Sequence, residues 1–375
     1  MSSWKMVPLG DAATFVNGFA FKPEDWGDVG IPIIRIQNLT GSSNIINYYN
    51  KPYNSKYEVL DGDILISWSA SLGVYEWTQG KALLNQHIFK VVFDKLQYNK
   101  RFFMYIISRK LDEMSSATHG STMKHITKKS FDAIKIPYPP LSVQQQIADA
   151  LDCANHLIQK NRSQIEKLEL LIKSRFIEMF GDPVTNPMRW ELKKLSSMGE
   201  LNRGVSKHRP RNDPELLGGI YPLIQTGDVA NSGLYIETYS NTYSEVGLKQ
   251  SKLWKKGTLC ITIAANIAKT GILAFDACFP DSVVGFSPNS RSDTIFINYL
   301  FGFFQKILEE QAPESAQKNI NLKILYELDV IAPPIALQTQ FSDFVQQVDK
   351  LKFEMRGRLE KLEILYKSLM QQYFS

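Results

Sequence analysis

The sequence has 375 residues, 44% hydrophobic and 22% charged, a composition typical of globular proteins and large enough for two or three domains with their own cores. Its net charge of +5 permits nucleic acid as a partner but does not demand it, because many ordinary proteins are mildly basic. Three cysteines without a CxxC pair favour a reducing cytosol, and no run approaches the roughly 18 apolar residues of a membrane span. We therefore expect a cytoplasmic protein without a membrane segment.

The first part of the chain is predicted to be mixed α/β. Runs at 31–36, 64–67 and 85–93 are rich in β-branched and aromatic residues and are separated by Gly, Asn and Pro turns. A helix follows in the run RFFMYIISRKL, and a last strand is expected near Ile134.

A long helix is predicted from about Ser142 to Phe180. Pro139 and Pro140 cannot continue a helix backward, and Ser142 with Gln145 fits a capping box. The sequence after Phe180, Gly-Asp-Pro, is typical of a helix end. At 1.5 Å per residue the helix would be about 60 Å long, which is longer than one turn of B-DNA, roughly 34 Å.

The second part of the chain repeats the first. A shift of 194 residues places Pro139 on Pro333 and aligns the two runs EKLE that begin at Glu166 and Glu360. Upstream, IPIIRIQNL matches YPLIQTGDV and DGDILIS matches KGTLCIT, while the run around Tyr299 is expected to form a buried helix. The sequence therefore predicts two copies of one unit, each a globular part followed by a helix. The second helix entrance has Ala336 and Thr339 at the capping-box positions, so we expect it to be the weaker of the two.

Both helices carry apolar residues with a seven-residue period, which indicates coiled-coil packing. The residues expected in this seam are Leu151, Ile158, Ile165, Leu168 and Ile172 in the first helix, and Val345, Val348, Leu359, Leu362, Tyr366 and Leu369 in the second. An internal repeat implies a pseudo-two-fold axis, so a pair formed within one chain would be antiparallel. The predicted fold class is α/β (α+β), with two globular parts separated by two long antiparallel helices.

The motifs of common catalytic sites are absent from the sequence. There is no GxGxxG, no P-loop and no HExxH or paired zinc spacing among the five histidines. Asp182 with the Glu-Leu-Lys run at Glu191 resembles a magnesium-dependent nuclease pattern, but the first repeat lacks the glutamate. We expect no catalytic residue, no metal ligand and no cofactor in this chain, and we keep a nuclease as a remote alternative.

The entrance Pro-Pro-Leu-x-x-Gln-x-x-Ile at Pro139, the long helix that follows and the second occurrence of both resemble specificity (S) subunits of type I restriction-modification systems. The resemblance covers the whole chain. It implies target recognition domains at 1–141 and 184–335, a central helix at 142–183 and a C-terminal helix at 336–375.

The resemblance also implies function and partners. Each recognition domain would read one half of a bipartite site in double-stranded DNA, and the helices would set the spacer and dock methyltransferase (M) subunits. Those partners would bind S-adenosylmethionine, and a restriction translocase-nuclease (R) subunit would use ATP and Mg²⁺. The alternative is a coiled-coil protein-interaction scaffold without sequence-specific DNA binding.

Side chains able to read base edges or hold phosphates occur at matching points of the two repeats. The candidates in the first repeat are Arg35, Gln37, Asn38, Ser67, Trp68, Ser69, Lys124 and His125. Those in the second are Gln225, Asp228, Asn266, Lys269, Lys318 and Asn319, together with a basic cluster of Arg203, Lys207, Arg209 and Arg211. The ordinary alternatives are solvated strand ends and linkers, and a core position for Trp68.

Overall fold

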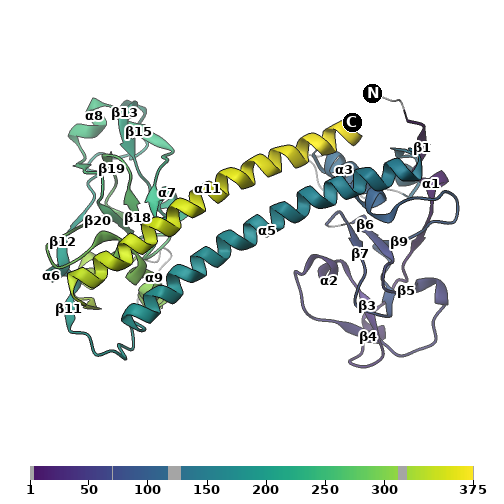
Figure 1. Ribbon diagram of the computed structural model, residues 1–375, viewed down its shortest axis with the longest axis horizontal. Helices are drawn as coiled ribbons and strands as arrows, with labels where there is room; N and C mark the ends of the chain where they lie inside the picture. Colours follow the sequence, from purple (N-terminus) through teal and green to yellow (C-terminus); the bar gives the residue numbers. More distant parts are fainter. Residues whose placement is uncertain (1–3, 70, 117–127, 311–318, 375) are drawn as a thin grey trace. The chain divides into compact units, whose positions relative to one another are not determined.

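The computed structural model describes residues 4–69, 71–116, 128–310 and 319–374, and these form two compact units. Unit 1 comprises residues 1–160 and 359–375, and unit 2 comprises residues 161–358. Each unit therefore contains one globular part together with a portion of both long helices, α5 (Leu141–Phe180) and α11 (Ile335–Phe374) (Figure 1).

Unit 1 contains two four-stranded sheets and a short strand pair. The first sheet has the antiparallel order β2 (Thr14–Asn17), β9 (Ile88–Val92), β6 (Ile64–Ser67), β7 (Gly73–Glu76). The second has the order β4 (Asn47–Tyr49), β3 (Ile31–Ile34), β8 (Ala82–Leu84), β5 (Glu58–Val59). Strand β1 (Met6–Pro8) pairs with β10 (Lys135–Pro137), and the helices are α1 (Leu9–Ala12), α2 (Ile36–Thr40), α3 (Lys100–Ser116) and α4 (Lys128–Asp132).

Unit 2 has nearly the same topology. Its first sheet has the order β12 (Gly199–Arg203), β20 (Val283–Pro288), β17 (Leu259–Thr262), β18 (Thr270–Leu273), β14 (Tyr235–Ile236). Its second has the order β15 (Asn241–Tyr243), β13 (Leu217–Leu223), β19 (Ala277–Cys278), β16 (Leu253–Trp254). Strand β11 (Leu192–Lys194) pairs with β21 (Asp329–Ile331), and the helices are α6 (Leu195–Met198), α7 (Thr226–Asn231), α8 (Glu245–Lys249), α9 (Thr294–Glu310) and α10 (Leu322–Tyr326). The repeat predicted from the sequence is thus a repeat of structure.

The two long helices are antiparallel within each unit. In unit 1 the beginning of α5, at Ile147 and Leu151, shares a core with Met370 and Phe374 near the end of α11. In unit 2 the end of α5 joins the beginning of α11, where the Phe176 ring meets the Phe341 ring edge to face at a centroid distance of 5.3 Å. The predicted antiparallel pairing is therefore confirmed.

The seam residues predicted from the seven-residue period lie against these cores or beside them. Leu151, Ile158, Ile172, Val345 and Val348 are buried. Ile165, Leu168, Leu359, Leu362, Tyr366 and Leu369 are half-buried. One polar residue of the seam, Lys352, is buried and pairs with Glu169 at 3.3 Å.

The helix entrances differ from the expected capping. Helix α5 begins at Leu141, and the Gln145 side chain bonds Asn99 and Asp149, so the predicted capping box at Ser142 and Gln145 is wrong. A buried glutamine fixes each entrance instead. Gln144 donates to the Pro139 carbonyl and accepts from the Asn99 amide, while Gln338 donates to the carbonyls of Pro333 and Arg291 and accepts from the Asp293 amide.

The second entrance has a buried glutamine and a serine in place of the missing capping box, and its expected weakness stays a prediction. Gln338 makes three hydrogen bonds, each 2.8–3.0 Å long, and Ser342 donates a further bond to the Asp293 carboxylate. Two other predictions are confirmed: α5 ends at Phe180, after which Gly181 adopts the left-handed φ of 74°, and the helix around Tyr299, α9, buries seven apolar residues. The strands predicted at 31–36 and 85–93 are shorter than expected, β3 at Ile31–Ile34 and β9 at Ile88–Val92.

Candidate nucleic-acid interface

A polar hollow of about 440 Å³ in unit 2 brings together segments that are far apart in the sequence. It is lined by Arg203 at the end of β12, Arg211 in the following loop, Thr226 at the start of α7, Asp281 before β20, and Asn319 with Asn321 before α10. The strand β12 lies beside β20, and Asn319 pairs with Ala264 just after β17, so the sheet order itself collects these side chains.

Asp281 organises the arginines of the basic cluster. Arg211 forms an ion pair with one Asp281 carboxylate oxygen at 2.5 Å, and Arg209 approaches the other at 3.5 Å. Arg203 donates from Nε to the Asp281 backbone carbonyl at 3.0 Å. The side chains of Arg209 and Arg211 remain about half exposed, so further donors of both guanidinium groups face solvent. A carboxylate that holds a guanidinium in this way reduces the conformational entropy that the arginine loses when it binds a base or a phosphate.

The rest of the basic loop is fixed by polar contacts. The backbone amides of Lys207 and His208 donate to Gln250, and the His208 ring lies 2.9 Å from Asp213. The Glu215 amide and the His208 ring hold the pKa of the Asp213 carboxyl below its ordinary value, because both hydrogen bonds stabilise the charged form. The Lys207 side chain is exposed.

A constrained loop follows β17 and carries two predicted residues. Ala265 and Ala268 adopt left-handed backbone conformations, with φ of 61° and 57°, which costs about 1–2 kcal/mol per residue for a side chain with Cβ. The buried Thr262 hydroxyl closes the loop, since it donates to the Asn266 carbonyl and accepts from the Lys269 amide. The Asn266 side chain is exposed, whereas Lys269 lies against α9 and donates to Gln305 at 3.3 Å. Backbone strain of this kind is concentrated at functional sites, so Asn266 is the stronger candidate of the two.

Polar residues at matching positions stabilise the starts of α2 and α7. Asn38 accepts a hydrogen bond from the Arg35 amide and donates to the Ile45 carbonyl, and Asp228 accepts from the Gln225 amide and from Ser240. These contacts occupy the side chains of Asn38 and Asp228, which fix the helix start. Gln37 and Gln225 are half-buried and exposed, respectively.

Arg35 has two neighbours in unit 1. Its guanidinium lies over the Trp26 ring at 4.7 Å from the ring centroid, and it donates to the Asn47 side chain at 3.2 Å. A stacked and hydrogen-bonded arginine is held in one orientation, as Arg211 is in unit 2, but by a ring in place of a carboxylate.

The predicted residues in the segment after β6 are buried or half-buried. Ser67 is fully buried, and its hydroxyl donates to the Ser71 carbonyl four residues later. Thr262 closes the corresponding loop of unit 2 in the same way. Trp68 stacks on Phe89 at 5.5 Å and packs against the core, as the alternative interpretation expected. Ser69 is half-buried. Lys124, His125 and Lys318 lie outside the described residues.

The residues of the nuclease alternative have other partners. The Asp182 carboxylate accepts from the amides of Val184 and Thr185, and Glu191 pairs with Lys193 at 3.2 Å. Among the residues that the structure describes, no group of three His, Cys, Asp or Glu side chains is placed to hold a metal ion. No described helix combines the length and the apolar character needed to cross a membrane.

Two features of the site were missed from the sequence. Asp281, Thr226 and Asn321 line the hollow, but single polar residues between strands carry no signal that they will meet distant arginines. Exposed apolar residues also recur at the same points of the two long helices. They are Leu157, Leu170 and Leu171 in α5 and, 194 residues later, Leu351, Ile364 and Leu365 in α11. The repeat alignment could have found this second set.

Comparison with known proteins points to one family. A family profile described as the type I restriction modification DNA specificity domain matches residues 1–170 and 187–364, one match in each repeat. The chain is 23% identical to the type I restriction enzyme EcoBI specificity subunit of Escherichia coli, over 99% of this chain and 85% of that protein. It is 24% identical to the MjaVIII specificity subunit of Methanocaldococcus jannaschii, over 98% of this chain and 91% of that protein.

The fold is likewise similar to that of a solved structure. The S subunit of the type I restriction-modification system of M. genitalium matches with a TM-score of 0.61 and 15% sequence identity, and the match covers 100% of this chain and 96% of that one. A chain from a study of complex assembly and conformational transition of the type I R-M system gives the same TM-score at 14% identity, with 100% and 98% coverage.

Proposed function

Because the chain belongs to the type I restriction modification DNA specificity domain family, we propose that each of its globular halves reads one part of a split site in double-stranded DNA. The chain is the DNA sequence-recognition subunit of a type I restriction-modification complex and is not itself the enzyme.

The observation that carries the proposal is the hollow of unit 2. Arg203 and Arg211, from two segments, line it and both bond Asp281, one at its backbone carbonyl and one at its carboxylate, beside Asn319 and Asn321. Arginine is the usual reader of guanine edges, and asparagine pairs with adenine edges, so this set contains donors and acceptors for both kinds of base pair. Lys207, Asn266 and Gln225, exposed on neighbouring segments of unit 2, are proposed to add phosphate or base contacts.

In unit 1 the proposed readers are Arg35 and Gln37, at the start of α2. Arg35 is held by Trp26 and Asn47 in the position that corresponds to Gln225 in unit 2. The two halves therefore present different side chains from equivalent backbone positions, which is what reading two different half-sites requires. Ser67, Trp68, Asn38 and Asp228 are proposed to support this surface and not to contact bases, since the protein itself occupies their side chains.

The long helices are proposed to set the unread spacer and to dock the partner subunits. Leu170 is 61% exposed and its repeat counterpart Ile364 is 60% exposed, and each has an exposed leucine next to it in the sequence, Leu171 and Leu365. Because the exposed set occurs twice, we propose that it binds two copies of one partner, the methyltransferase subunit.

The chemistry belongs to those partners in this proposal. S-adenosylmethionine would be held by the methyltransferase subunits, and ATP and Mg²⁺ by the translocase-nuclease subunit. The three cysteines are free thiols, two of them buried, which suits the reducing cytoplasm where the DNA is found.

A salt titration tests the proposal. The complex of this chain with its methyltransferase partner should bind duplex DNA with an affinity that falls steeply as salt rises, because phosphate contacts release counterions, while the preference for its own sequence persists. A flat salt response, or equal affinity for all sequences, would refute it.

A further inference from the structure

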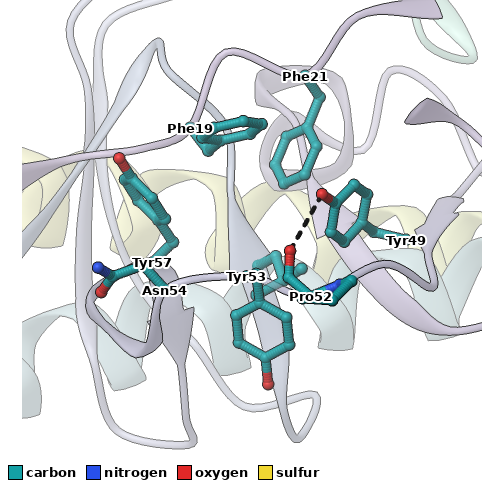
Figure 2. Close-up of a pocket in the computed structure, with 8 residues that line it drawn as sticks. Phe19, Phe21, Tyr49, Pro52, Tyr53, Asn54 and Tyr57 are labelled. Atoms are coloured by element: carbon teal, nitrogen blue, oxygen red, sulfur yellow. Dashed lines mark hydrogen bonds between the residues drawn. The ribbon is translucent and has the colours of Figure 1, made fainter. Parts of the chain in front are cut away.

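Besides the polar hollow of unit 2, the structure contains a cavity of about 430 Å³ in unit 1, whose walls are mainly aromatic. Five rings line it, those of Phe19, Phe21, Tyr49, Tyr53 and Tyr57. Figure 2 shows them arranged around the open space, with Tyr53 opposite the two phenylalanines and Asn54 beside Tyr57. The volume falls within the roughly 300–1,000 Å³ of typical small-molecule sites.

The rings that line the cavity contact one another at steep angles. Phe19 and Phe21 meet at a centroid distance of 4.9 Å and an angle of 72°, and Phe21 meets Tyr49 at 5.1 Å and 68°. Phe19 lies 5.4 Å from Tyr57 and is 37% exposed. A cavity walled by rings in several orientations can enclose a flat, weakly polar ligand by stacking and edge contacts.

The charges around the cavity limit what it can bind. No acidic side chain is among the described residues that line it, although the Glu58 carboxylate accepts from the Tyr53 hydroxyl at 3.3 Å. Two lysines lie at its rings: the Lys56 ammonium is 4.7 Å from the Tyr57 centroid and that of Lys81 is 5.7 Å from the Tyr53 centroid. Lys81 is neutralised by Glu58 at 2.9 Å, whereas no described carboxylate forms an ion pair with Lys56. A quaternary ammonium, the usual ligand of an aromatic cage, is therefore disfavoured, and a ligand that carries a negative group is favoured.

Polar groups at the edge of the cavity suit a heterocycle. The Asn54 oxygen accepts from the Lys56 amide at 3.0 Å, which leaves the side-chain amide nitrogen as a donor, since no described residue accepts from it. The Tyr57 hydroxyl lies on the same side of the cavity (Figure 2). Side chains of this kind bind the edges of nucleobases, and aromatic rings stack on their faces.

The aromatic cavity is not imposed by the fold. Tyr243 is the counterpart of Tyr49 in unit 2. Tyr49 pairs with Ile31 in β3, and Tyr243 pairs with Tyr221, the residue of β13 that aligns with Ile31 in the repeat. There the surroundings are aliphatic, with Leu216 and Leu248 packed in the same cluster as Tyr243. The cage of rings is therefore a property of the first repeat alone within the described residues.

We propose that this cavity binds an unstacked nucleobase that carries a phosphate, with the base among the five rings and the phosphate near Lys56. Two sources share this chemistry, a free nucleotide and an unpaired base of DNA. The proposal goes beyond sequence recognition, since a cavity that takes a base out of the stack does not identify a half-site.

Fluorescence of 2-aminopurine tests the proposal, because stacking on aromatic rings quenches it. The full-length chain should quench 2-aminopurine nucleoside monophosphate saturably and bind the uncharged nucleoside more weakly. Tyr57→Ala should weaken nucleotide binding about tenfold through lost stacking. Lys56→Glu, at an exposed residue that leaves the fold intact, should weaken binding of the nucleotide but not of the nucleoside. Tyr239→Ala, which removes an exposed ring in unit 2, is the matched control and should change nothing.

A DNA arm, compared with the free-nucleotide arm, distinguishes the sources. A duplex with one unpaired 2-aminopurine should be quenched if DNA supplies the base, and quenching of the free nucleotide alone would assign the cavity to a small molecule. Absence of saturable binding in every arm would overturn the proposal, as would binding that neither variant alters. If the variants weakened only association with the methyltransferase subunit, the cavity would hold a protein side chain and the proposal would be wrong. Sequence-specific duplex binding, measured in parallel, tests DNA recognition separately.

Discussion

At the scale of single residues, the pairing of Arg211 with Asp281 is the contact that we propose to be most directly tied to sequence reading. Arg211→Ala should lower affinity for the preferred site and relax the preference at one base pair, by about 1–3 kcal/mol for a bidentate contact. Asp281→Asn keeps the shape of the side chain but removes the charge, so it should weaken binding less and broaden the preference. Competition binding with a set of single-base variants of the site measures both effects.

The control for this pair lies in the same unit. Arg291 is exposed outside the hollow, and Arg291→Ala changes net charge by the same amount as Arg211→Ala. Equal losses for the two variants would mean that Arg211 contributes only general charge.

A buried glutamine at each helix entrance is the second residue-scale feature. Gln338→Leu would leave two carbonyls and one amide without their partner, so the free energy of unfolding of unit 2 should fall by about 2–4 kcal/mol. Chemical denaturation followed by circular dichroism measures this change. Gln340→Leu, at an exposed position of the same helix, should leave stability almost unchanged. A similar loss in both variants would mean that replacing any glutamine of this helix by leucine is destabilising, and that the buried hydrogen bonds of Gln338 are not the cause.

At the scale of elements, the long helices test the spacer proposal. Deletion of one heptad from each helix, residues 161–167 and the repeat-related 355–361, keeps the seven-residue period and shortens each helix by about 10 Å. At 3.4 Å per base pair, the unread spacer should shorten by about three base pairs while both half-sites stay the same. Sequencing of the methylated sites measures the spacer, and an unchanged spacer would contradict the proposal.

The elements also show what could be predicted from the sequence. The ends of the long helices, the repeat and the antiparallel seam could be predicted from the sequence. Prolines and glycines mark helix ends and a seven-residue period marks the seam, and each of these signals depends only on residues close together in the sequence. The strand β6 matches its predicted range, Ile64–Ser67, for the same reason. The capping of α5 was predicted wrongly, because a buried glutamine that bonds the Asn99 amide depends on a distant segment.

The candidate site was less accessible than the fold. The basic cluster was found because its residues are adjacent, but the carboxylate that orients it, Asp281, lies 70 residues from Arg211. Ser67 shows the opposite case: a hydroxyl at a strand end suggested DNA contact, whereas in the structure it is buried and bonds the Ser71 carbonyl. Which face a polar side chain turns to solvent follows from tertiary packing and not from local spacing.

At the scale of the whole molecule, the duplication predicts the stoichiometry of the complex. Leu170→Asp and Ile364→Asp alter repeat-related exposed residues, so each should remove one methyltransferase subunit and the double variant should remove both. Mass photometry of the purified complex measures the loss from two partner copies to one and to none. The variants should fold normally because both side chains face solvent. A complex that keeps two partners in the double variant would mean that this surface does not dock them.

The central claim is that two unlike readers in one chain specify a split DNA site. Its most direct test is to map methylated bases in DNA modified by this chain together with its methyltransferase partner. We expect two short specified sequences separated by a spacer of fixed length and free sequence, and methylation that disappears when this chain is omitted. A single uninterrupted site, or methylation that is the same with and without this chain, would contradict the account.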